Sequence, residues 1–97
     1  KINSSLKIND YKLDKNLRKL VKNDLTLELT EKEIDLIELL YKKNFIKKKE
    51  ILSTIWKYSE DADTHTVETH IYRLRKKIKE VFKDEKFIKN EKKGYTI

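Results

Sequence analysis

Residues 66–78 read TVETHIYRLRKKI, and this stretch decides the fold of the chain. Its apolar residues recur at intervals of four, three and four positions, at Val67, Ile71, Leu74 and Ile78. This spacing predicts a helix with one buried stripe. Since each residue turns the helix by about 100°, the opposite face carries His65, Thr69, Tyr72, Arg73 and Lys76.

The polar side of this predicted helix is strongly basic. Residues 69–79 hold five Lys and Arg side chains and no acidic one. A helix with one apolar face and one basic, hydrogen-bonding face is typical of a DNA recognition helix. The alternative is an ordinary solvated helix on a lysine-rich surface, so the context of the stretch has to decide between the two.

Composition limits the class of protein. The 97 residues suit a single domain, and 24 basic against 17 acidic residues give a net charge of +7. This balance favours polyanionic partners, with nucleic acid first and an anionic membrane second. The chain has no cysteine, which excludes disulfides and thiolate metal sites. No apolar run approaches the roughly 18 residues of a membrane span, and we expect a cytoplasmic protein without a membrane partner.

The first half of the chain predicts a small sheet followed by two helices. Apolar residues alternate with polar ones through residues 6–29, which indicates an antiparallel meander of three or four strands. Thr30 and Glu33 form a capping box that starts a helix ending near Lys43. After a short extended piece, a second helix is predicted over residues 48–56, with Trp56 in the core.

The second half predicts the long helix and a hairpin. Thr64 is the expected N-cap of the helix, which continues to Phe82. Strands are predicted at residues 87–89 and 95–97, joined by a turn at residues 92–94. Gly94 is the only glycine of the chain, and it is expected to supply a positive φ in that turn.

Meander, three helices and basic hairpin follow in an order that, with residues 66–78, resembles a known family. It is the OmpR/PhoB-type winged-helix DNA-binding effector domain of bacterial two-component response regulators. The resemblance implies an α+β fold, a winged helix-turn-helix with a C-terminal β-hairpin wing. It covers residues 6–97, and the matching positions are Leu29-Thr30, Glu33-Ile34, Ile51-Leu52, Trp56, Thr66-Val67, His70-Ile71, Leu74-Arg75-Lys76 and Gly94-Tyr95.

The resemblance implies sequence-specific binding of double-stranded DNA and regulation of transcription. In the family the third helix enters the major groove and the wing reaches the adjacent minor groove. Arg73 becomes the main base reader, because its guanidinium can bond guanine O6 and N7 together. The other implied base contacts are Thr69, Glu68 and Tyr72. The implied phosphate contacts are Thr66, Arg75, Lys76 and His65, and those of the wing are Lys92, Lys93 and Gly94.

Further partners come from the same resemblance. Relatives contact RNA polymerase through the loop before the third helix, here Lys57, Tyr58, Ser59, Glu60, Asp61, Ala62 and Asp63. Relatives also bind tandem half-sites side by side, which implies a tandem dimer on DNA. Residues 1–97 form the effector domain alone, so a receiver domain with its phosphorylated Asp is expected elsewhere in the full-length protein.

The sequence departs from the family pattern at several positions. His65 stands where relatives usually carry Arg, and Lys47 replaces a Ser before the second helix, which predicts a weaker cap there. Lys57 stands where Gly is common. The wing tip is about one residue short, and Lys92 replaces an Arg. Because a lysine is a point charge, we expect this wing to read sequence less well.

Other functions find less support in the residues. His65 and His70 project from different helix faces, so we expect no metal site. No nucleophile constellation surrounds Ser53, and neither an enzymatic role nor a cofactor is expected. Two alternatives stay open: a winged helix that binds protein, and a non-specific nucleic-acid or RNA binder. The latter predicts exposed stacking aromatics, for which Tyr72 is the one clear candidate.

Overall fold

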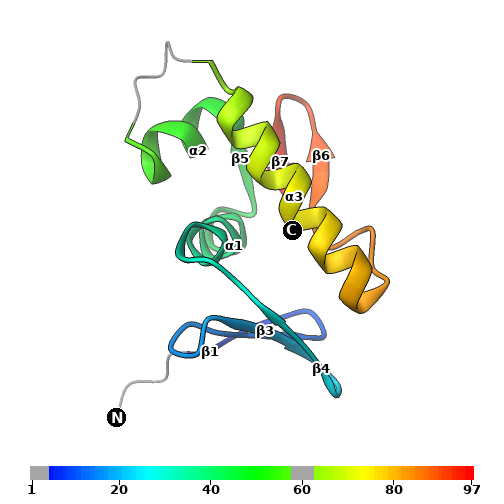
Figure 1. Ribbon diagram of the computed structural model, residues 1–97. Helices are drawn as coiled ribbons and strands as arrows, with labels where there is room; N and C mark the ends of the chain where they lie inside the picture. Colours follow the sequence, from blue (N-terminus) through cyan, green and yellow to red (C-terminus); the bar gives the residue numbers. More distant parts are fainter. Residues whose placement is uncertain (1–4, 58–62) are drawn as a thin grey trace.

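Two antiparallel sheets flank a group of three helices in the computed structural model, which describes residues 5–57 and 63–97 (Figure 1). The architecture confirms the predicted α+β winged helix. In chain order the elements are β1 (Ser5–Ile8), β2 (Tyr11–Asp14), β3 (Lys19–Lys22), β4 (Leu25–Glu28), α1 (Glu31–Lys43), β5 (Phe45–Lys47), α2 (Lys48–Ile55), α3 (His65–Phe82), β6 (Lys89–Glu91) and β7 (Gly94–Thr96).

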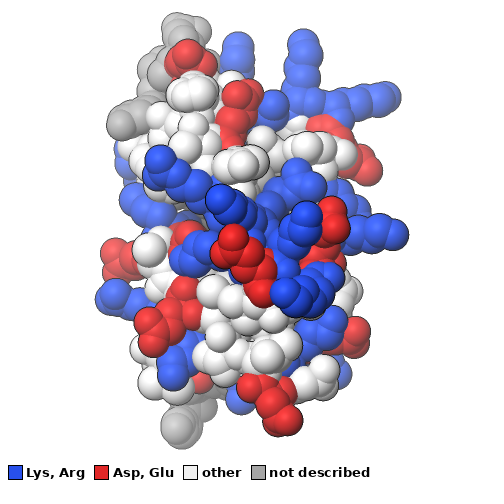
Figure 2. Space-filling model, turned by 45° about the vertical axis from the view of Figure 1, so that its right-hand side comes forward, with Lys and Arg blue, Asp and Glu red and all other residues white. Residues whose placement is uncertain are grey.

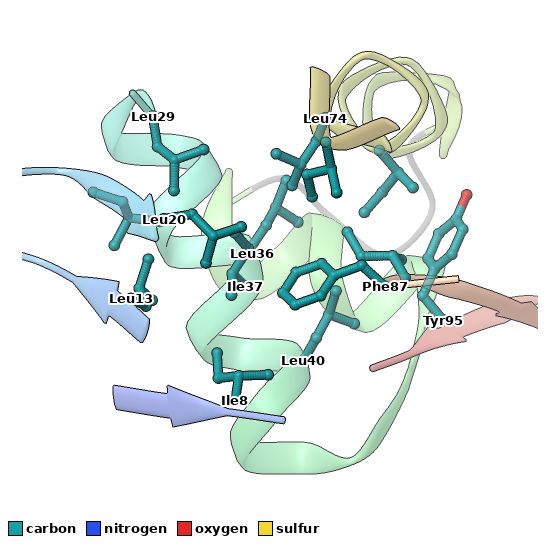
Figure 3. Close-up of a cluster of buried hydrophobic side chains, with 14 of the residues drawn as sticks. Ile8, Leu13, Leu20, Leu29, Leu36, Ile37, Leu40, Leu74, Phe87 and Tyr95 are labelled. Carbon is teal, nitrogen blue, oxygen red and sulfur yellow. The ribbon is translucent and has the colours of Figure 1, made fainter. Parts of the chain in front are cut away.

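The N-terminal sheet has the strand order β1-β2-β3-β4, as expected of a meander. Four leucines lie directly opposite one another across it: Leu6 pairs with Leu13, Leu13 with Leu20, and Leu20 with Leu27. Because side chains alternate along a strand, this row forms one apolar face. The face packs against the helices, and Figure 3 shows Leu13 and Leu20 meeting Leu36 and Ile37 of α1.

Helix α1 lies in the middle of the molecule, between the sheet and the other helices (Figure 1). The capping box is confirmed: the Glu33 amide donates to Thr30 Oγ1 at 3.2 Å, and the Thr30 amide donates to Glu33 Oε1 at 2.8 Å. Glu33 is also the one charged residue that is buried among the described residues. Its Oε1 accepts a second hydrogen bond, at 2.7 Å, from Lys77 Nζ on α3.

A second contact fastens the sheet to the end of α3. The Tyr11 hydroxyl donates to Asp84 Oδ2 at 2.7 Å, across 73 positions of sequence. The Tyr11 ring meets Phe82 edge-on with centroids 5.0 Å apart, and it lies 4.6 Å from the ring of Phe87. Such aromatic pairs add to the free energy gained by burial alone.

The C-terminal hairpin differs from the prediction in its boundaries. The strands are Lys89–Glu91 and Gly94–Thr96, joined by a two-residue turn at Lys92 and Lys93. Phe87 and Ile88, predicted as strand residues, are instead buried anchors before β6. Strand β5 pairs with β7, so the hairpin belongs to a three-stranded sheet that leads directly into α2.

The predicted reason for Gly94 was wrong. Its φ is not positive, and the left-handed residue of the turn is Lys93, with a φ of 55°. Gly94 is needed for lack of space, since a Cβ there would lie 2.5 Å from the Ile46 carbonyl oxygen and 2.7 Å from the Phe45 ring. Because Gly94 has no side chain, β5 can lie closer to β7 than it could if any other residue stood at this position.

This close approach makes Gly94 a test of the wing anchor. Gly94→Ala should destabilise the fold by about 1–3 kcal/mol, because the clashing Ile46 oxygen belongs to the backbone. Lys93→Ala keeps the left-handed turn strain and is the matched control, with an expected change below about 0.5 kcal/mol. Urea unfolding of the two variants measures the difference. Equal midpoints for Gly94→Ala and the unmutated chain would contradict the close approach.

Candidate nucleic-acid interface

Helix α3 has the two faces that its sequence predicts. The apolar stripe is buried and extends one residue further than expected, to Val67, Ile71, Leu74, Ile78 and Phe82. On the opposite side Arg73 and Lys76 are exposed, and Tyr72 has 67% of its surface exposed. The polar face is therefore free to meet a partner along the length of the helix.

The N-cap position of the helix is the predicted one, but another side chain supplies the hydrogen bond. Thr64 occupies the N-cap position, but its side chain caps none of the described amides. Asp63 Oδ1 accepts a hydrogen bond from the His65 amide at 3.0 Å instead. The Thr64 hydroxyl is turned toward Glu68, at 3.5 Å from Oε2. A carboxylate at the positive end of the helix also favours the helix dipole.

The two arginines of α3 lie on different flanks, because two residues turn a helix by about 200°. Arg73 is exposed, whereas Arg75 is half-buried toward the wing. Burial raises the pKa of Tyr95 on β7, opposed by the charges of Lys48 and Arg75, while Glu68 adds to the rise. Arg75 also lines an open hollow with Tyr72, Lys76, Lys79, Glu80, Lys83 and Glu85. Arg75 thus belongs to the flank whose charge acts on Tyr95 of the wing, away from the flank that carries Arg73.

The first turns of α3 bring the smaller predicted contacts together. His65 is exposed, and its Nε2 lies 3.4 Å from Thr69 Oγ1. Thr66 and Thr69 are half-buried. His65 and Thr69 therefore lie together on one side of the first helical turn.

Glu68 is engaged in a contact that the sequence did not reveal. Its Oε2 lies 3.1 Å from Lys48 Nζ, at the start of α2. The two residues are 20 positions apart and belong to different helices, so no periodicity connects them. Of the four predicted base contacts, Glu68 is therefore the one whose side chain has a charged partner among residues 5–57 and 63–97.

The wing presents its lysines as expected. Lys92 and Lys93 are exposed at the turn, whereas Gly94 is buried and shapes the hairpin without facing solvent. The Lys93 carbonyl accepts a hydrogen bond from the Lys48 amide at 3.0 Å. Figure 2, turned to bring this side forward, shows many Lys and Arg side chains with acidic ones interspersed.

Most of the predicted polymerase segment lies outside the described residues, namely Tyr58, Ser59, Glu60, Asp61 and Ala62. Of its two described ends, Lys57 is exposed with a φ of 62°, a backbone conformation that glycine adopts freely. This agrees with the glycine common there in the family. Asp63, at the other end, is the residue that caps α3.

His70 and Trp56 form a ring contact at the edge of the core. Their centroids are 4.8 Å apart, and Lys32 Nζ lies 5.9 Å from the Trp56 ring. Trp56 was predicted to lie in the core. It is half-buried and packs against the edge of the core. Across residues 5–57 and 63–97, no cluster of acidic and histidine side chains could hold a metal ion. Nor does that part of the chain contain a helix long and apolar enough to cross a membrane.

Comparisons with known proteins agree with this geometry. Residues 15–97 match the family described as "Transcriptional regulatory protein, C terminal". The response regulator ArlR of Staphylococcus aureus, in strains Mu50 and MW2, is 33% identical over 92 residues, which cover 93% of this chain. The chain spans 42% of the length of these relatives.

A solved structure shares the fold. The structure titled DNA binding domain of E. coli CadC superposes with a TM-score of 0.79 at 23% identity, covering 98% of this chain and 92% of the other. The family match takes in all three helices and the wing, and its members are transcriptional regulators, not enzymes. The chain belongs to the family of C-terminal domains of transcriptional regulatory proteins.

Proposed function

We propose that this chain binds double-stranded DNA sequence-specifically and regulates transcription as the output domain of a response regulator. The observation that carries the proposal is the exposed basic face of α3 beside the lysine-tipped β6–β7 wing. Helix α3 lies in the major groove, and the wing reaches the adjacent minor groove. The ArlR relatives are response regulators by name, and the CadC structure is a DNA-binding domain by title, which supports the same reading.

The proposed roles follow the flanks of α3. Arg73 reads a guanine with its two-pronged guanidinium, and Thr69 and Tyr72 contact neighbouring bases. The resemblance implies Glu68 as a further base contact, but its Oε2 lies 3.1 Å from Lys48 Nζ, so we assign it no base contact. The proposed phosphate contacts are Thr66, Arg75, Lys76 and His65. Lys92 and Lys93 contact the DNA backbone beside the minor groove. Gly94 leaves room for the wing to pack against β5.

The remaining partners belong to the whole protein. A receiver domain in the full-length protein fits relatives that are response regulators and more than twice as long as this chain. From the family resemblance we also propose that residues 57–64 contact RNA polymerase and that the protein binds DNA as a tandem dimer. A cytoplasmic location is part of the same proposal, because the chromosome of a bacterium lies in the cytoplasm.

Salt dependence tests the proposal at its base. If α3 and the wing neutralise roughly four to six phosphates, log K should fall against log salt with a slope of about −4 to −5. Fluorescence titrations of a labelled duplex at several salt concentrations give this slope. A flat profile would exclude DNA as the partner and favour a winged helix that binds protein.

Arg73 and Arg75 separate specificity from affinity. Arg73→Ala should cost about 1–3 kcal/mol on a duplex selected from a random pool, and much less on unselected DNA, because the bidentate guanine contact is lost. Arg75→Ala is the matched control on the other flank and should weaken both duplexes equally. Competition binding with the two duplexes measures the ratio. A parallel loss on both duplexes for Arg73→Ala would mean that another residue reads the bases.

The wing lysines should contribute charge and little sequence reading. Lys92→Ala combined with Lys93→Ala should leave the melting temperature nearly unchanged and make the salt slope shallower by roughly one to two units. Lys7→Ala with Lys12→Ala removes the same charge from adjacent positions on the outer face of the N-terminal sheet and is the control. Equal slopes for the two double variants would speak against wing contact with DNA. A large loss of A·T preference in flank-randomised duplexes would show that the wing reads sequence.

A further inference from the structure

We propose that Lys48 and Glu68 form a brace that holds the wing at a fixed position relative to the recognition helix. The inference rests on the proposed DNA-binding function, because the brace matters most when α3 and the wing meet one duplex together. It assigns both residues to positioning: neither would contribute a DNA contact of its own.

Lys48 joins three elements at one point. Its amide donates to the Lys93 carbonyl in the wing turn at 3.0 Å. Its Nζ lies 3.1 Å from Glu68 Oε2 on α3, and 5.7 Å from the centroid of the Tyr95 ring on β7. Since Lys48 is the first residue of α2, a single side chain and its own amide link α2, α3 and the wing.

The surroundings limit how else these two charges can be used. The side chain of Lys48 is 28% exposed and that of Glu68 is 44% exposed, so both are drawn partly out of solvent. The neighbours Lys47 and Lys49 are exposed, which makes them the freer cations at this corner. Glu68 also lies 3.5 Å from the Thr64 hydroxyl before α3, so the brace reaches the start of the recognition helix.

A brace of this kind acts through geometry more than through global stability. Partly exposed ion pairs contribute little to the free energy of unfolding. When two binding elements are held at the spacing of their targets, the second contact forms at a high effective concentration. Loosening the wing would lower that concentration and weaken DNA binding, although the core residues stay packed.

The free protein gives the first test. Glu68→Gln removes the charge without changing the residue whose amide is observed. We expect protection of the Lys48 amide from hydrogen exchange to fall about two- to fivefold, with an unchanged melting temperature. Lys48→Met should behave alike, whereas Lys48→Arg should keep the protection. Lys49→Met and Glu80→Gln, which remove exposed charges from α2 and α3, are the controls. Unchanged protection in Glu68→Gln would overturn the brace.

A double-mutant cycle on a selected duplex gives the second test. Relative to Lys49→Met and Glu80→Gln, we expect Lys48→Met and Glu68→Gln each to weaken binding about three- to tenfold. The combined variant should bind no more weakly than the single variant with the lower affinity, because each substitution removes the same interaction. The salt slope of Lys48→Met should equal that of the unmutated chain.

Three outcomes would overturn the inference. Additive losses would mean that the residues act separately, and a slope shallower by about one for Lys48→Met would make it a phosphate contact. Loss of discrimination at a single base pair in Glu68→Gln would make Glu68 a base reader. Absence of salt-dependent duplex binding by the unmutated chain would instead contradict the proposed function, and the exchange measurements would still decide whether the brace exists.

Discussion

The carboxylate of Glu33 is the contact on which the arrangement of the helices depends. One of its oxygens, Oε1, accepts from the Thr30 amide at 2.8 Å and from Lys77 Nζ at 2.7 Å. The first bond starts α1, and the second ties α1 to the middle of α3. Because Glu33 is buried, loss of Lys77 would leave a charge with little access to water, which is far costlier than loss of a surface pair. The orientation of the recognition helix is therefore fixed from within the core.

Local patterns in the sequence predicted those parts of the fold that local physics determines. The capping box at Thr30 and the apolar stripe of α3 were found because each is a regular spacing along one element. A weaker cap at Lys47 was also predicted, and among the described residues its side chain makes no capping bond to α2. In each case the signal lies within one helix, because helical periodicity and the capping of the first amides are local properties.

The errors arose where tertiary contacts decide the outcome. The sequence predicts a positive φ at Gly94, whereas the structure has the left-handed conformation at Lys93. Gly94 is required because β5 lies too close for a Cβ. Thr64 is the N-cap residue of α3, as predicted, but its hydroxyl is directed toward Glu68 and the side-chain bond to the His65 amide comes from Asp63. Among the candidate site residues, the basic face of α3 followed from periodicity. The Lys48–Glu68 contact did not, because it joins two helices across an unpredicted geometry.

The hydrogen bond between Tyr11 and Asp84 makes the contact between the N-terminal sheet and the end of α3 depend on the protonation of Asp84. Burial raises the pKa of Asp84, but the hydrogen bonds from the Tyr11 hydroxyl and the Lys86 amide, with the nearby charges of Lys22 and Lys86, lower it overall. A carboxylate whose pKa is lowered by folding stabilises the fold at pH values above its unfolded-state pKa of about 3.9. This stabilisation is lost as the pH falls through the pKa of the folded state. Acid therefore weakens a hydrogen bond that links the meander to the segment between α3 and the wing.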